Sequence, residues 1–182
     1  MPMSILSVYH QSTPEQANKT LTHMEDIAST LGVAGIELLS LPLASALPAG
    51  ADQASILAAC AEPLARLQSE GYASLEVLSL DCGIDGAPEQ RTSLRQARRY
   101  PVDQQFYCVG GRLQLCLQVD DYVLAVQCEK HDLLRVPAGV VHWLDIGEQP
   151  RLALVRLFAS SKVPAATLAD QTLAGLIPGL DD

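Results

Sequence analysis

The sequence predicts a mainly β protein of the α+β class, a barrel or sandwich of short strands with helices packed against its outside. Two observations lead to this prediction. Short segments rich in Val, Leu, Tyr and Phe crowd residues 74–160, and turn-forming residues separate them. Residues 1–72 instead space many apolar residues by three and four, as amphipathic helices do. Such helices need an apolar surface to cover, so we expect them outside the barrel.

Two helices are expected in the N-terminal part. Residues 14–31 follow capping residues, begin at Pro14 and repeat apolar residues at helical spacing. Residues 52–69 carry a second helical pattern, which Pro63 is expected to kink or divide. Between the two patterns, residues 39–50 are rich in Pro and Gly and are expected to form a loop.

Strands are expected in four later stretches, which span residues 75–80, 106–128, 132–146 and 151–158. Leu113, Leu115 and Leu117 alternate with less apolar residues, which is the two-residue period of a half-buried strand. The predicted core includes Leu115, Leu117, Val123, Val136, Leu154 and Val155.

Length and composition limit the classes of protein. A chain of 182 residues predicts a single domain over residues 1–182, with residues 161–182 as a C-terminal tail. A net charge of -9 argues against nucleic-acid binding, and no segment reaches the roughly 20 apolar residues of a membrane span. Five cysteines without CxxC spacing indicate reduced core residues of a cytoplasmic protein. The oligomeric state has no signal in the sequence.

One short motif points to a site. The segment VPAGVVH, residues 136–142, resembles the second motif of cupin barrels, P-x-G-x-x-H. Proline and glycine favour a tight turn, after which His142 would start a strand with its ring inside the barrel. A lone inward histidine is about as often an ordinary core residue as a ligand, so the motif alone predicts no chemistry.

Three longer stretches carry a wider resemblance. VYHQSTPEQANKTLTHMEDIASTL, CEKHDLLRVPAGVVHWLDIG and RLALVRLF are similar, in the same order, to stretches of bacterial acireductone dioxygenases. The resemblance implies a cupin double-stranded β-helix, or jelly-roll barrel, with N-terminal helices packed outside. It also implies oxygen-dependent cleavage of the acireductone of methionine salvage, with Fe(II) or Ni(II) bound.

The resemblance also implies a metal site that this sequence does not preserve. The family's ligands are two histidines one residue apart, a glutamate four residues later and the histidine of the second motif. Ala97, Arg99, Asp103 and His142 stand at these positions. At most His142 and Asp103 could bind a metal, fewer than the three protein ligands of a usual catalytic site. We therefore expect no cofactor.

Neighbouring positions differ from the family as well. Gln105 stands where the family has an arginine, and Leu144 stands where it commonly has phenylalanine. Together with the metal positions, the predicted pocket comprises Ala97, Arg99, Asp103, Gln105, Phe106, His142 and Leu144. Arg99 is expected to enter the barrel near Asp103 and His142, as a substitute for the missing cation. The other histidines have ordinary interpretations: His10 near a strand end, His23 on a helix and His131 in a surface turn.

Three functions remain open at this point. The first is an acireductone dioxygenase-like cupin whose catalysis is impaired, retained as a binding or regulatory protein. The second is an active acireductone dioxygenase with an atypical Fe or Ni site. The third is a metal-free isomerase or lyase in which His142 is a general base and Arg99 holds an anionic substrate, or else a small-molecule binding protein with its ligand in the barrel.

Overall fold

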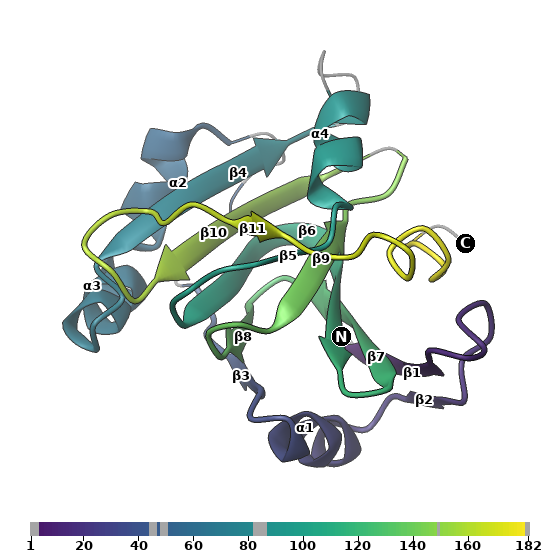
Figure 1. Ribbon diagram of the computed structural model, residues 1–182. Coiled ribbons are helices and arrows are strands. Elements are labelled where there is room, and N and C mark those ends of the chain that lie inside the picture. The colour runs from purple at the N-terminus through teal and green to yellow at the C-terminus, as the bar shows by residue number, and fades with distance from the viewer. Residues whose placement is uncertain (1–3, 44–46, 48–50, 82–86, 149, 181–182) are drawn as a thin grey trace.

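Two antiparallel layers of strands face each other and share one long strand (Figure 1). The computed structural model describes residues 4–43, 47, 51–81, 87–148 and 150–180. In the first layer the strand order is β11 (Thr167–Leu168), β5 (Arg98–Arg99), β9 (Val141–Asp145), β6 (Gln104–Val119), β7 (Tyr122–Glu129), β1 (Ile5–His10) and β2 (Lys19–Leu21). In the second it is β4 (Ser74–Leu80), β10 (Leu152–Phe158), β6, β8 (Asp132–Val136) and β3 (Glu37–Ser40). The prediction of a mainly β protein is confirmed.

Strand β6 belongs to both layers. Its first half, up to Gly111, pairs with β10, and from Arg112 onward it pairs with β7. The register against β10 shifts between Ala153 and Leu154, which marks a β-bulge next to the two glycines. Gly111 has φ +70°, a conformation that glycine adopts without steric cost. The strand changes layer at this point.

The core lies between the layers and on both outer faces. All six predicted core residues are buried. Leu115, Leu117, Val136 and Leu154 belong to the cluster between the layers. Val123 and Val155 instead belong to separate clusters, each on the outer face of one layer. Strands that are buried on both faces explain the nearly continuous apolar runs in the sequence.

Helices α2 (Gln53–Ala59) and α3 (Ala61–Ser69) pack against the outer face of the second layer, as predicted for the N-terminal helices. The Asp52 side chain caps α2 by accepting a hydrogen bond from the Ser55 amide at 2.7 Å. The predicted division occurs at Cys60, so Pro63 lies in the first turn of α3. Proline is tolerated there because the first amides of a helix have no intrahelical acceptor.

The prediction of a helix over residues 14–31 is wrong in its first half. Residues 19–21 form β2, which pairs with β1, and helix α1 begins only at Met24 and ends at Val33. Leu21 packs against the inner cluster from β2, so pairing with a neighbouring strand overrides the local helical spacing. The expected loop over residues 39–50 is also too long, because β3 extends to Ser40. Its residues 44–46 and 48–50 lie outside the described residues.

The N-terminal part is therefore less helical than predicted, since β1, β2 and β3 join the two layers. Helix α1 contributes Ile27 and Leu31 to the inner cluster. A further helix, α4 (Ala87–Leu94), has no counterpart in the sequence prediction. Its apolar spacing is weak, so it lacks the periodic signal by which the other helices are found.

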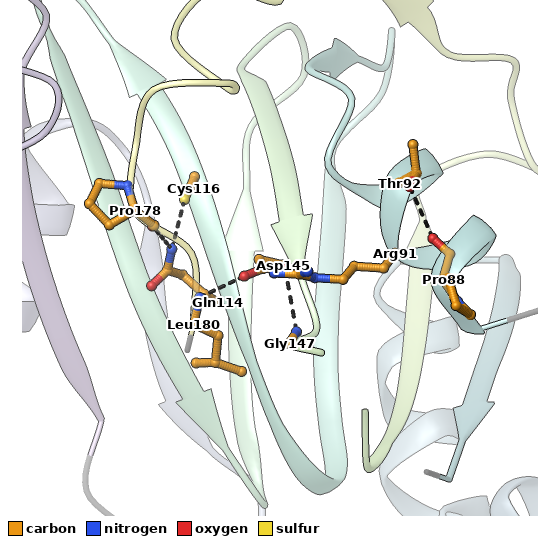
Figure 2. Close-up of polar contacts among 9 residues, drawn as sticks. All are labelled: Pro88, Arg91, Thr92, Gln114, Cys116, Asp145, Gly147, Pro178 and Leu180. Carbon is orange, nitrogen blue, oxygen red and sulfur yellow. Dashed lines mark hydrogen bonds and ion pairs between the residues drawn. The ribbon is translucent and has the colours of Figure 1, made fainter. Parts of the chain in front are cut away.

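The C-terminal segment, residues 167–180, covers the outer face of the first layer. Ala174 and Ile177 pack there against Trp143 of β9. Gln114 Nε2 donates to the Pro178 carbonyl at 2.9 Å, and the Leu180 amide donates to Asp145 Oδ2 at 2.6 Å (Figure 2). Both contacts fix the end of the chain to strands β6 and β9.

Asp145 connects three parts of the fold (Figure 2). Besides the Leu180 amide, its carboxylate binds Arg91 Nε of α4 at 3.1 Å, and it accepts a weaker bond from the Gly147 amide at 3.4 Å. Burial raises the pKa of this carboxyl group, but the Leu180 amide and the Arg91 guanidinium outweigh burial and hold the pKa below its usual 3.8. The ionised form therefore stabilises the folded state.

We expect Asp145→Asn to lower the free energy of unfolding at pH 7 by about 1–3 kcal/mol, because the buried Arg91 contact loses its charge partner. When folding lowers the pKa of a carboxyl group, the ionised group stabilises the fold at pH values above its pKa in the unfolded state. This stabilisation is lost as the pH falls through the pKa in the folded state. The gap between wild type and variant should therefore close below pH 3.8. Urea unfolding at several pH values measures the gap, with Asp26→Asn on the exposed face of α1 as the control. A gap that is constant down to pH 3 would contradict this account.

Candidate functional site

His142 lies at the start of β9, directly after the Pro137-Ala138-Gly139 turn. Gly139 has φ +82°, and its amide donates to the Tyr100 carbonyl at 2.9 Å, which fixes the turn against the end of β5. His142 is paired in register with Leu117, a residue of the inner cluster. Side chains directly opposite in a sheet share a face, so the imidazole points between the layers.

Aromatic rings surround the imidazole. Tyr100 stacks on it with a centroid distance of 5.8 Å, and Phe106 of β6 meets it edge-on at 5.5 Å. Phe158 of β10 packs against Tyr100 at 5.1 Å. His142 is only 1% exposed, and the three rings are buried as well. We call His142, Tyr100, Phe106, Phe158 and the arginine described next the aromatic cage.

Arg156 brings a guanidinium group into this cage. Its Cζ lies 5.2 Å from the ring centres of Tyr100 and Phe106, and 5.6 Å from that of Phe158. Nη2 donates to Gln104 Oε1 at 3.4 Å, and Nη1 lies 3.9 Å from a carboxylate oxygen of the half-exposed Glu76. Arg156 is only 7% exposed, so cation–π contacts are a main part of its surroundings.

The environment of His142 fixes its protonation. Burial lowers the pKa of its ring to about 4; the Val140 carbonyl opposes this shift, while the charges of Arg156 and Arg98 add to it. The ring is therefore neutral near pH 7. Nδ1 lies 2.9 Å from the Val140 carbonyl oxygen, which can only accept, so Nδ1 carries the proton. Nε2 is then a hydrogen-bond acceptor, and it has no partner among the described residues.

The structure does not bring the predicted ligand positions together. In β5 it is Arg98, not Ala97 or Arg99, that pairs in register with His142. Ala97 is fully buried on the opposite face, in the outer cluster that contains Trp143. Arg99 is exposed, so the expectation that it enters the barrel as a substitute cation is wrong.

The C-terminal segment holds β5 in this register. The Ala97 amide donates to Gln171 Oε1 at 2.7 Å, and Gln171 Nε2 donates back to the Ala97 carbonyl at 2.8 Å. The Ala169 amide donates to the same carbonyl at 3.0 Å. With its backbone fixed to this segment, residue 97 faces the outer cluster.

Asp103 and Gln105 also lie away from His142. Asp103 is exposed, and its Oδ1 accepts a hydrogen bond from the Ala138 amide at 2.7 Å, so it needs no cationic partner. Gln105 is buried, but its side chain accepts from Arg135 Nε at 3.2 Å and shares a face with Tyr107 on the outside of the second layer. The inward neighbours in β6 are Gln104 and Phe106.

Of the predicted pocket, Phe106, His142 and Leu144 share the inner face. Sequence reasoning missed Arg156, Tyr100 and Phe158. One signal was available for Arg156, because RLALVRLF places a charge within an apolar strand, two residues from the inward Leu154 and from Phe158. A buried charge in such a position needs a special environment and often marks a functional site.

The donor set around His142 does not fit the Fe(II) or Ni(II) that the resemblance implies. Within the part of the chain that the structure describes, no three His, Cys, Asp or Glu side chains are grouped so that they could hold a metal ion. The cage supplies one imidazole, aromatic rings and a permanent positive charge. A guanidinium that lies over the same two rings as the imidazole of His142 opposes the binding of a divalent cation there.

Comparison with known proteins identifies the family. Residues 88–165 match the ARD/ARD' family. An acireductone dioxygenase of Pseudomonas fluorescens strain Pf-5 is 42% identical over 181 residues, which cover 99% of this chain and 100% of that protein. The chain belongs to the acireductone dioxygenase family. A second acireductone dioxygenase, from Pseudomonas savastanoi pv. phaseolicola, is 40% identical over 181 residues, with 99% and 100% coverage.

A solved structure supports the fold of this acireductone dioxygenase family member. The acireductone dioxygenase from Bacillus anthracis with a cadmium ion in its active centre superposes with a TM-score of 0.73. The match covers 91% of this chain and 99% of that one at 18% identity. The predicted cupin fold is thereby confirmed. No helix in the described part of the chain is long and apolar enough to cross a membrane.

Proposed function

We propose that this acireductone dioxygenase family member does not carry out metal-dependent dioxygenation, and that it serves as a binding cupin without a resident metal. The observation that carries the proposal is the composition of the aromatic cage. Tyr100 and Phe106 contact His142, and Arg156 lies over the same two rings; none of the three is a usual ligand of Fe(II) or Ni(II). The same proposal places the protein in methionine salvage, where it acts beside an active acireductone dioxygenase or regulates one.

The contrasting function is an active acireductone dioxygenase with an atypical site. The full-length similarity to relatives that carry this name favours it. The geometry favours the first function, because a catalytic metal needs about three protein ligands and no three His, Cys, Asp or Glu side chains among the described residues are grouped to supply them. The third function, an isomerase or lyase that uses Arg99, loses its anion-binding group, because Arg99 is exposed.

Metal content and activity, measured together, test the proposal. The protein should be purified without chelator, and elemental analysis should find well below one iron or nickel per chain. Acireductone consumption under air, with Fe(II) and Ni(II) each supplied in excess, should be at least about 1000-fold slower than for an active relative, since a catalytic metal contributes several kcal/mol.

The 42% identical Pseudomonas fluorescens relative, prepared in the same way, is the positive control for both measurements. It should carry metal and consume acireductone. Stoichiometric iron or nickel in the present protein, together with consumption within about tenfold of the relative, corresponding to about 1.4 kcal/mol in the barrier, would refute the proposal.

A further inference from the structure

Strand β4 is an edge of the second layer, and its outer side is unpaired (Figure 1). It pairs in register with β10 from Ser74 to Leu80, and no other described strand pairs with it. Residues 74–80 also make no backbone hydrogen bond to any other segment that the structure describes. The outward N–H and C=O groups of β4 are therefore available to another strand.

β4 lacks the features that protect the other edge strands. Strands β2, β3 and β11 are only two to four residues long, and β2 and β3 carry the exposed charges of Lys19 and Glu37. β4 has seven residues, no lysine, arginine or proline, and Glu76 as its single charge. It also pairs with β10 without a bulge. Natural proteins protect exposed edges by these devices, so their absence indicates that β4 is covered by a partner strand.

The sequence of β4 fits an antiparallel pairing with itself. Paired residues in a continuous sheet point to the same face, so the two-fold axis must pass through a residue paired with its own copy. A register centred on Val77 pairs all seven residues and places Glu76 opposite Leu78 of the second copy. A register centred on Glu76 places two carboxylates opposite each other, and one centred on Leu78 pairs fewer residues. Charge and length therefore both favour Val77 as the centre.

The surroundings of β4 permit a second copy to approach. Leu75 and Val77 pack against the outer cluster that contains Ile56 of α2. Helix α2 contains no charged residue, and its exposed side chains include Ala54 and Ala58. Each copy carries a net charge of -9, so a surface for self-association must be poor in charge. The edge of β4 and the neighbouring α2 meet this condition.

We propose that two copies of this chain associate through their β4 strands, antiparallel and centred on Val77. The second layers of the two barrels then form one continuous sheet, with both α2 helices on the same face of it. The dimer does not depend on metal. Its failure is therefore distinct from failure of the proposed function, which shows as metal content and acireductone consumption.

Sedimentation equilibrium of the full-length protein tests the dimer. One chain has a mass of 19.5 kDa, and at about 100 μM protein we expect twice this mass. Val77→Lys places two like charges opposite each other at the centre and should weaken dimerisation at least about tenfold. Val77→Thr is the matched control, because it keeps a β-branched side chain without charge, and it should stay within about threefold of wild type.

Disulfide cross-linking tests the register. Val77→Cys is made together with Cys82→Ser, because the four other cysteines are buried. Opposed Cα atoms in an antiparallel pair lie about 4.5–5.5 Å apart, within the range of a disulfide. Mild oxidation should therefore give a covalent dimer on a non-reducing gel. Leu75→Cys in the same background is the control on the same face of the strand, since its two copies would lie about 13 Å apart and cannot be bridged.

A monomer at every concentration up to about 1 mM overturns the inference, as does a dimer that folded Val77→Lys leaves unchanged. A dimer in which Val77→Cys fails to cross-link uses another surface, and equal cross-linking of Leu75→Cys means another register; both results also overturn it. If Val77→Lys does not fold, as judged by circular dichroism, the two cysteine variants still decide the question, because Val77→Cys changes the side-chain volume little.

Discussion

Gly111→Ala is expected to destabilise the protein so strongly that little folded material remains. A Cβ atom at this position would lie 1.7 Å from the Arg151 carbonyl oxygen and 2.6 Å from its carbon. Both are backbone atoms next to β10, so no side chain can move aside. The φ of +70° adds the strain of a left-handed conformation. We expect a loss above about 4 kcal/mol, a large part of the stability of a typical domain.

Gly139→Ala is the matched control for this substitution. Its φ of +82° imposes similar strain, but nothing lies within 4 Å of the added Cβ. It should cost only about 1 kcal/mol. Solubility, circular dichroism and urea unfolding of the two variants separate the clash from the strain. Equal stability of the two variants would show that β6 and β10 do not approach each other as closely as the structure indicates.

Restoring the family's ligand residues is expected to fail as a route to a metal site. In the triple variant Ala97→His, Arg99→His and Asp103→Glu, the new side chains would follow the present backbone. Residue 97 faces the outer cluster and residues 99 and 103 are exposed, so none of them would reach His142. Equilibrium dialysis with Ni(II) or Co(II), followed by elemental analysis, should find no metal bound to the folded variant.

The same variant should be less stable by about 2–5 kcal/mol, because Ala97 is fully buried and an imidazole there both overpacks the cluster and buries polar atoms. The double variant Arg99→His and Asp103→Glu is the control, and it should remain within about 1 kcal/mol of wild type because both positions are exposed. A folded triple variant that binds one nickel ion would mean that β5 can change register despite the Gln171 contacts.

The strands and the core were predictable because their signal is strong and local. Runs such as residues 151–158 are apolar on both faces, and they are buried by the opposite layer on one side and by helices or the C-terminal segment on the other. The start of α1 was not predictable in the same way. Leu21 fits a helical repeat, but the pairing of β2 with β1 sets its structure. The residues of β1 lie outside the segment 14–31 from which the helix was predicted.

The site was only partly predictable, for a related reason. The P-x-G-x-x-H motif located His142 correctly, since the turn and the strand are local. The orientation of β5 depends on Gln171, more than 70 residues later, so the family's ligand positions did not predict that Ala97 and Arg99 face away from His142. Arg156 was overlooked because an arginine within a strand is usually an edge or surface residue, whereas here three rings from separate segments enclose it.

The passage of β6 from one layer to the other also bears on how the protein folds. Each layer completes its hydrogen-bond ladder on one half of this single strand, because β9 and β7 pair with the second half and β8 and β10 pair with the first. The layers are thus not independent folding units, and the native state should be lost in one cooperative transition. Other pairings, of β1 with β7, β4 with β10 and β3 with β8, join residues far apart in the chain, which is the topology of slowly folding domains. The bulge beside Gly111 then acts as a register pin during assembly, because a slip on one side of it would misalign the strands on the other.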